Sequence, residues 1–198
     1  MKLILAWQSA ARRALFAAAG IAHEAMAPGV DEDIAKEGLR AEGVNARGLA
    51  DALAELKAMR LSLRHPADLV LGCDQTLSRD DDVMLDKPAS REDAAEQLRG
   101  LRGRTHRLIS AAVICEGGRP VWRHVDVARL SMRSFSESFL EDYLDAEWPA
   151  IAGCVGGYRL EGLGVQLFDR IDGSHFTILG LPLLALNDYL RTRGLLKA

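Results

Sequence analysis

The chain has 198 residues, a formal net charge of −3 and 27% charged residues. This length suits one domain with a sizeable core, or one domain with a closely packed second lobe. The slightly acidic balance argues against binding to a nucleic-acid polymer, which needs clustered positive charge. A single nucleotide is still allowed, because a few well-placed Lys and Arg side chains can hold it.

The cysteines and the apolar segments indicate in which cellular compartment the protein is found. Cys73, Cys115 and Cys154 are an odd number with wide spacing, which predicts neither a disulfide framework nor a zinc site. The apolar run over residues 3–6 is far too short for a signal peptide or a membrane span, and no later segment reaches that length. We therefore expect a cytoplasmic protein with no membrane partner.

The first part of the chain is expected to alternate between strand and helix. Residues 3–6 predict a short buried strand, and Ser9 is expected to cap a helix over 10–19 that Gly20 closes. Residues 32–63 favour helix, with Gly43 and Gly48 dividing them into two helices. The later elements follow in order: a strand over 69–73 that ends at Asp74, a helix from Ser90 to Leu98, strands over 105–115 and 121–130 joined by a hairpin turn at 116–119, a helix from Ser136 to Ala146, a strand over 164–171, and a final helix over 181–193 ended by Gly194.

This order of elements predicts the fold class. Strands and helices alternate early, and the middle of the chain supplies an antiparallel pair. The combination predicts an α/β fold, with a mixed twisted β-sheet flanked by helices.

Three short segments carry residues that suit phosphate chemistry. Arg12 and Arg13 stand in the first turn of a predicted helix, where cations oppose the helix dipole unless an anion is bound there. Asp74 follows a buried strand, where open α/β sheets place their ligands, and Lys87 precedes a proline that stiffens its loop. Taken singly, each is equally consistent with a solvated surface charge or an ordinary loop.

Together these segments occur in an order that resembles the Maf family of nucleotide pyrophosphatases. The similarity covers nearly the whole chain. Each motif is short and weakly specific, and seven of them stand in register. They are Ala6-Trp7-Gln8-Ser9-Ala10-Ala11-Arg12, Asp31-Glu32, Ala54-Glu55-Leu56-Lys57-Ala58, Gly72-Cys73-Asp74-Gln75, Asp86-Lys87-Pro88, Ala152-Gly153 with Glu161-Gly162-Leu163-Gly164, and Gly180-Leu181-Pro182.

The resemblance implies one Maf/ITPase-like domain over residues 1–198, or two lobes with the active-site cleft between them. The implied reaction is hydrolysis of a nucleoside triphosphate to a monophosphate and pyrophosphate, with a divalent cation, Mg²⁺ or Mn²⁺, as cofactor. On this hypothesis Asp74 activates water, Glu32 positions the metal or the water, and Asp74 is a second group for the metal. The implied substrate-binding residues are Ser9, Arg12, Lys57 and Lys87.

Base choice in the family follows three positions, which correspond here to Ala11, Gln75 and Glu161. The branch that prefers dTTP and UTP has Arg, Thr and Gln there, and the branch linked to 7-methyl-GTP has Trp, Gln and Glu. Gln75 and Glu161 side with the second branch, and a carboxylate suits the N–H donors of a guanine. Ala11 departs from it. Trp7 either replaces the missing aromatic surface or packs in the core, and we favour packing.

Two other functions remain as alternatives. One is a pyrophosphatase for dTTP and UTP, and the other is a nucleotide sensor without turnover, tied to the control of cell division. The expected partner is a nucleoside triphosphate in each case, and a homodimer is an open alternative for the assembly.

Overall fold

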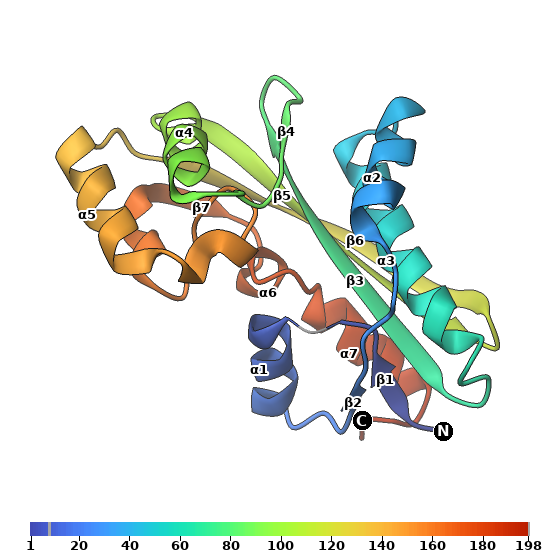
Figure 1. Ribbon diagram of the computed structural model, residues 1–198. Coiled ribbons are helices and arrows are strands. Elements are labelled where there is room, and N and C mark those ends of the chain that lie inside the picture. Colours follow the sequence, from blue (N-terminus) through green and yellow to red (C-terminus); the bar gives the residue numbers. More distant parts are fainter. Residues whose placement is uncertain (8, 198) are drawn as a thin grey trace. The chain divides into compact units, whose positions relative to one another are not determined.

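The computed structural model describes residues 1–7 and 9–197, and Figure 1 labels the elements. The chain divides into two compact units. Unit 1 comprises Met1–Gln75, Ile109–Asp126 and Ser174–Ala198, and unit 2 comprises Thr76–Leu108 and Val127–Gly173.

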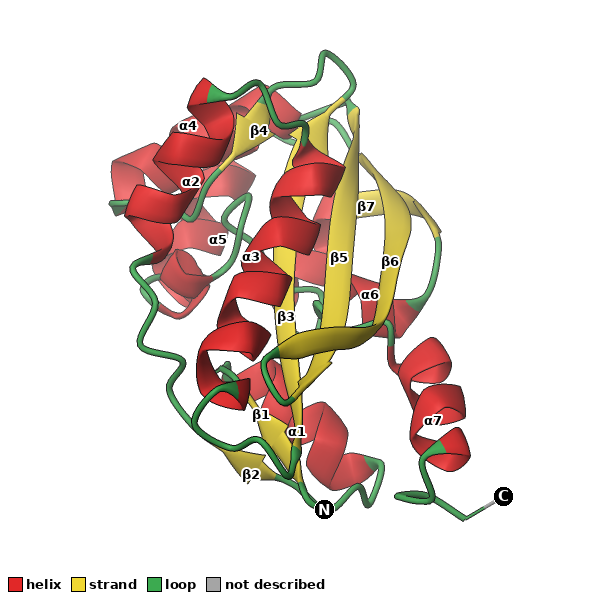
Figure 2. Ribbon diagram, turned by 90° about the vertical axis from the view of Figure 1, so that its right-hand side faces the viewer, coloured by secondary structure: helices red, strands yellow, loops and turns green. Residues whose placement is uncertain are grey.

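The described residues contain a seven-stranded sheet in the order β2-β1-β3-β5-β6-β7, with β4 paired to β3 (Figure 2). β1 pairs in parallel with β2 and β3, whereas the β3–β4 and β6–β7 pairs are antiparallel. The predicted mixed sheet is therefore confirmed. The strands are β1 (Leu3–Leu5), β2 (Glu24–Ala25), β3 (Leu69–Arg79), β4 (Met84–Leu85), β5 (Thr105–Glu116), β6 (Arg119–Met132) and β7 (Phe168–Asp172).

Helices accompany the sheet in both units. None within residues 1–7 and 9–197 is long and apolar enough to cross a membrane. The helices are α1 (Ala10–Ala18), α2 (Glu32–Ala41), α3 (Ala46–Ser62), α4 (Arg91–Leu101), α5 (Glu137–Glu147), α6 (His175–Ile178) and α7 (Leu183–Thr192), with 3₁₀ turns η1 (Ala150–Gly153) and η2 (Leu163–Leu167).

The core of unit 1 follows from strand alternation, because successive side chains of a strand point to opposite faces. Leu5 and Leu71 join the cluster that includes Phe16 of α1 and Leu186 of α7. The alternate residues of the same strands, such as Val70, point to the opposite face and pack with Leu61 of α3. α1 and α7 therefore cover one face of this part of the sheet, and α3 covers the other.

The α3 helix lies directly on the backbone of β3, as Figure 2 shows. A Cβ added to Gly72 would lie 2.0 Å from the carbonyl oxygen of Ala54 and 2.8 Å from the backbone nitrogen of Ala58. Only a glycine on the strand leaves room for this approach. Because Lys57 precedes Ala58 and Asp74 lies two residues beyond Gly72, the same contact sets the spacing between these two charged side chains.

We expect Gly72→Ala to lower the free energy of unfolding by about 3 kcal/mol, because backbone atoms of α3 would have to move. Urea unfolding measures it. Gly38→Ala is the matched control, since a Cβ at Gly38 of α2 meets nothing within 4 Å. Alanine is also the better helix former, so the control should unfold at the same urea concentration or a slightly higher one. Equal midpoints for Gly72→Ala and the wild type would contradict the close α3–β3 contact.

Unit 2 has its own buried aromatic cluster. His106 is fully buried, with Nε2 2.7 Å from the hydroxyl of Tyr158, and both rings contact Phe168. Burial lowers the pKa of His106 to about 4, so this ring is neutral at pH 7. Exposed ion pairs such as Arg99–Glu137 join α4 to α5.

Most local predictions about helix ends and turns are confirmed. Ser90 and Ser136 cap α4 and α5 by accepting hydrogen bonds from the third residue beyond. Ser9 stands at the same position in α1, although its bond to the Arg12 nitrogen is long at 3.5 Å. The turn between β5 and β6 consists of Gly117 and Gly118, both with positive φ, as a two-residue hairpin requires.

Three predictions about element boundaries differ most from the structure. The strand expected to end at Asp74 runs on to Arg79, because its last residues pair with β4. Gly48 does not break a helix: it lies in the first turn of α3, where its N–H donates to the capping side chain of Asn45. The strand expected over 164–171 begins only at Phe168, because the preceding residues, Leu163–Leu167, form η2.

Candidate active site

The most unusual feature of unit 1 is a buried lysine that contacts two carboxylates. The ammonium of Lys57 lies 2.7 Å from Oδ1 of Asp74 and 3.0 Å from Oε2 of Glu32. Only 5% of the Lys57 side chain and 10% of the Asp74 side chain are exposed, against 35% for Glu32. Charged residues are rarely buried this deeply unless they are paired. Three of the predicted site residues are thus brought together.

Each of these three side chains is placed by a local feature of the sequence. Glu32 begins α2, where Asp31 caps the helix by accepting from the Ile34 nitrogen at 3.2 Å. Lys57 stands on α3, which lies against Gly72. Asp74 points to the α3 side of the sheet because it alternates with Cys73, which belongs to the core cluster on the other face.

Asp74 lies inside β3, and not at its end as the sequence predicted. It nevertheless lies where a ligand of an open α/β sheet is expected to bind. β1 ends at Leu5, which is paired with Leu71, and the nitrogen of Ala6 still donates to the Leu71 carbonyl at 2.8 Å. Asp74 therefore lies in β3 just beyond the carboxyl end of its parallel neighbour. Open α/β sheets bind ligands at this place.

Arg12, on α1, contacts the backbone of β3. Its Nη1 donates to the carbonyl oxygen of Cys73 at 3.1 Å, and its guanidinium lies 5.9 Å from the ring of Trp7. Trp7 is only 4% exposed and packs against Phe16 in the core cluster, as the core-packing alternative predicted. Ala11, on the same helix turn as Arg12, is half-buried.

Gln75 makes contacts that the sequence did not predict. Its side-chain nitrogen lies 2.9 Å from the hydroxyl of Ser110, 3.0 Å from the carbonyl oxygen of Thr177 and 3.0 Å from that of Ile178. These residues come from β5 and α6, so Gln75 links three segments of unit 1. The Gly180-Leu181-Pro182 motif was the only sequence signal near this cluster.

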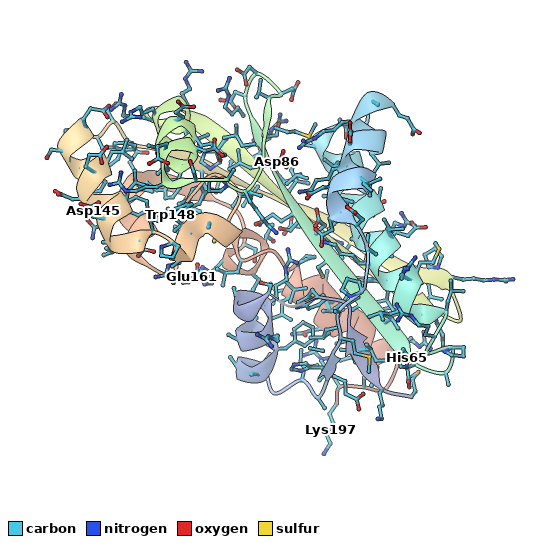
Figure 3. All side chains as sticks on the ribbon, viewed as in Figure 1. His65, Asp86, Asp145, Trp148, Glu161 and Lys197 are labelled. Atoms are coloured by element: carbon cyan, nitrogen blue, oxygen red, sulfur yellow. The ribbon has the colours of Figure 1, made fainter. Side chains whose placement is uncertain are left out.

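Lys87 and Glu161 belong to unit 2. Both are exposed, and Figure 3 labels Glu161 together with Asp86, the neighbour of Lys87. Burial raises the pKa of the Cys154 thiol, with the charge of Glu161 adding to that effect and the charge of Lys87 opposing it. Both side chains thus lie within electrostatic reach of Cys154. Their roles toward the unit 1 cluster stay predictions.

The loop that carries Glu161 is fixed by Glu147. This buried carboxylate accepts from Nε of Arg159 at 2.6 Å and from the backbone nitrogen of Leu163 at 3.0 Å. Burial raises the pKa of Glu147, but the Arg159 and Leu163 hydrogen bonds outweigh it and leave that pKa below its ordinary value. Glu161 therefore lies between Arg159 and Leu163, both of which are held by hydrogen bonds to Glu147.

Glu32 and Asp74 are the groups of this cluster that suit the expected divalent cation. Two carboxylates and one ammonium leave a net charge of −1 at Glu32, Lys57 and Asp74. Among residues 1–7 and 9–197 no group of three or more His, Cys, Asp or Glu could hold a metal ion. Mg²⁺ is commonly bound through one or two carboxylates together with substrate phosphates, so two carboxylates fit this mode.

Comparison with known proteins places the chain in a family. The model of the Maf-like protein family matches residues 2–193, and the chain belongs to this family. Proteins called nucleoside triphosphate pyrophosphatase are similar to it. The one from Roseobacter denitrificans is 50% identical and the one from Caulobacter vibrioides 51%, each over 97% of this chain and 96% of the relative. The one from Sphingopyxis alaskensis is 48% identical over 98% of both chains. A solved HAM1 protein from Coxiella burnetii is 11% identical, with a TM-score of 0.47, over 67% of this chain and 73% of its own.

Proposed function

We propose that this chain hydrolyses a nucleoside triphosphate to a nucleoside monophosphate and pyrophosphate, with Asp74 as the general base. The class of enzyme, a hydrolase of acid anhydrides in nucleotides, follows from relatives about half identical over nearly the whole chain. The observation that carries the assignment to Asp74 is its buried contact with Lys57 beyond the carboxyl end of β1. A carboxylate fixed in this way can be aimed at a water molecule.

The proposed reaction is a single displacement at the α-phosphorus. A water oxygen bonds to this phosphorus, the bond from it to the bridging α–β oxygen breaks, and pyrophosphate leaves. The water proton passes to Asp74. Lys57 contacts Oδ1 of Asp74, so we assign Oδ2 as the oxygen that accepts the proton. Such phosphoryl chemistry depends mainly on positioning and on stabilising charge.

Arg12, Lys57 and Lys87 are proposed to hold the triphosphate, with Ser9 at the start of α1. Two carboxylates near a highly charged triphosphate would repel it, which supports a requirement for a divalent cation. Glu32 and Asp74 would hold that cation, Mg²⁺ or Mn²⁺, which neutralises phosphate charge when bound. Lys57 keeps both carboxylates oriented.

For the nucleobase we propose a preference for a guanine-type base, with 7-methyl-GTP as the leading candidate. Gln75 and Glu161 match the corresponding branch of the family, whereas Ala11 does not. The alternative substrates are dTTP and UTP. Glu161 is exposed on an anchored loop, so its carboxylate can accept hydrogen bonds from a ligand.

Glu161→Gln is expected to reduce the preference for 7-methyl-GTP over UTP in kcat/KM by about tenfold, because a charge-assisted hydrogen bond becomes a neutral one. Steady-state kinetics on both nucleotides measures the ratio. Glu96→Gln, a change at another exposed glutamate of unit 2, is the control and should leave the ratio unchanged. An unaltered ratio in Glu161→Gln would refute the role in base choice.

The activity itself is tested by pyrophosphate release from 7-methyl-GTP, GTP, dTTP and UTP, with Mg²⁺ and with Mn²⁺. We expect release with at least one nucleotide, and none after the metal is removed with a chelator. Folded protein that binds nucleotide but releases no pyrophosphate from any of them would favour the nucleotide sensor.

A further inference from the structure

Gln75, a residue of β3, donates hydrogen bonds to the carboxyl-terminal end of the α6 helix. The carbonyls of Thr177 and Ile178 are among the last of α6, and carbonyls in this position lack partners within a helix. The Gln75 amide nitrogen reaches both at 3.0 Å. The hydroxyl of Ser110 donates to the same Thr177 carbonyl at 2.7 Å and accepts from Gln75 at 2.9 Å.

The chemistry of these partners fixes the orientation of the Gln75 amide. Carbonyl oxygens only accept hydrogen bonds, so the NH₂ group must face them. A carboxylate of the same length could not donate there. The donors of Gln75 are therefore engaged within unit 1, and they face α6 and Ser110.

The α6 end continues into the turn that bounds Arg12. The nitrogen of Gly180 donates to the Thr177 carbonyl at 3.0 Å, the same oxygen that Gln75 contacts. Gly180 has a φ of +88°, and a Cβ built there would lie 2.8 Å from both Nε and Nη2 of Arg12. The guanidinium thus lies against the bare Cα of Gly180.

Arg12 is held from its other side by the strand that carries Gln75. Its Nη1 donates to the carbonyl of Cys73, two residues before Gln75 in β3. The guanidinium therefore lies between β3 and the Gly180 turn. The side chain that ties these two segments together is Gln75.

We propose that Gln75 is a positioning residue: it fixes the Gly180 turn on β3 and thereby places Arg12 for the triphosphate. This inference rests on the proposed function, because it takes Arg12 to bind phosphate. Its consequence is specific. Loss of Gln75 should weaken binding of the triphosphate, which all nucleotides share, so KM should rise for every nucleotide, whichever base is preferred.

The test is a double-mutant cycle between Gln75→Met and Arg12→Lys, with KM measured for 7-methyl-GTP, GTP, dTTP and UTP. Gln75→Met should raise KM by about tenfold for every nucleotide turned over, the size expected for one charge-assisted hydrogen bond. The double variant should have nearly the KM of Arg12→Lys, because both changes remove the same contact. Gln166→Met, at an exposed glutamine of unit 2, is the control and should change nothing.

A purely structural role would reduce the folded, active fraction and hence kcat, while KM stayed constant. A KM that rises for one nucleotide alone in Gln75→Met, or additive effects with Arg12→Lys, would overturn the proposal. If Gln75→Met fails to fold, Ser110→Ala loosens the same cluster from β5 and should give the same pattern at smaller size; an unchanged KM would then count against it.

The same double-mutant cycle can be measured without catalysis. Calorimetry then gives the affinity of each variant for inorganic pyrophosphate. If the wild type turns over no nucleotide, the proposed function fails. Non-additive losses of pyrophosphate affinity would nevertheless support the link between Gln75 and Arg12, and additive losses would refute it.

Discussion

Asp74→Asn is expected to lower kcat by a factor of about 10²–10⁴, the usual contribution of a general base. The amide has almost the shape of the carboxylate, and its oxygen can still accept from Lys57, so the cluster should keep its geometry. What it loses is the ability to take a proton from water. Nucleotide affinity should therefore fall much less than turnover, because Arg12, Lys57 and Lys87 are untouched and Glu32 remains for the divalent cation.

Kinetics and calorimetry with a non-hydrolysable triphosphate separate the two effects. Asp169→Asn, which removes an exposed carboxylate in β7, is the control and should keep wild-type turnover. Equal losses of affinity and of turnover in Asp74→Asn, or unchanged turnover, would exclude Asp74 as the base.

Lys57→Met is expected to abolish detectable turnover and to lower the free energy of unfolding by about 3–5 kcal/mol, the cost of breaking a buried ion pair from one side. The methionine fills a similar volume but removes the ammonium that contacts both Asp74 and Glu32. The two carboxylates would then repel each other next to α3.

Chemical unfolding at neutral pH measures the loss. Arg170→Met is the matched control, because the Arg170–Asp172 pair is exposed and such pairs contribute at most about 1 kcal/mol. Similar losses in the two variants would mean that the Lys57 contacts are no stronger than a surface ion pair.

Local features of the fold could be predicted from the sequence, because capping and turn residues act on their immediate neighbours. Ser90 and Ser136 cap helices through contacts three residues away, and Gly117-Gly118 fits a two-residue hairpin. The end of β3 could not be predicted in this way. Apart from Leu77 its last residues are polar, and they are strand because Leu77 and Ser78 pair with β4.

The candidate site was predictable as a set of residue types and not as an arrangement. The motifs indicated Glu32, Lys57 and Asp74, yet their contact depends on the approach of α3 to Gly72, which links residues distant in the sequence. The contacts of Gln75 with α6 span more than a hundred residues, at Thr177 and Ile178. No local pattern marks these two carbonyls as acceptors.

The most direct test of the central claim is to let the wild-type enzyme turn over its best nucleotide in H₂¹⁸O and to weigh the products. Attack of water at the α-phosphorus predicts one ¹⁸O atom in the nucleoside monophosphate and none in the pyrophosphate. Label in the pyrophosphate, or release of inorganic phosphate with a nucleoside diphosphate, would contradict the proposed reaction.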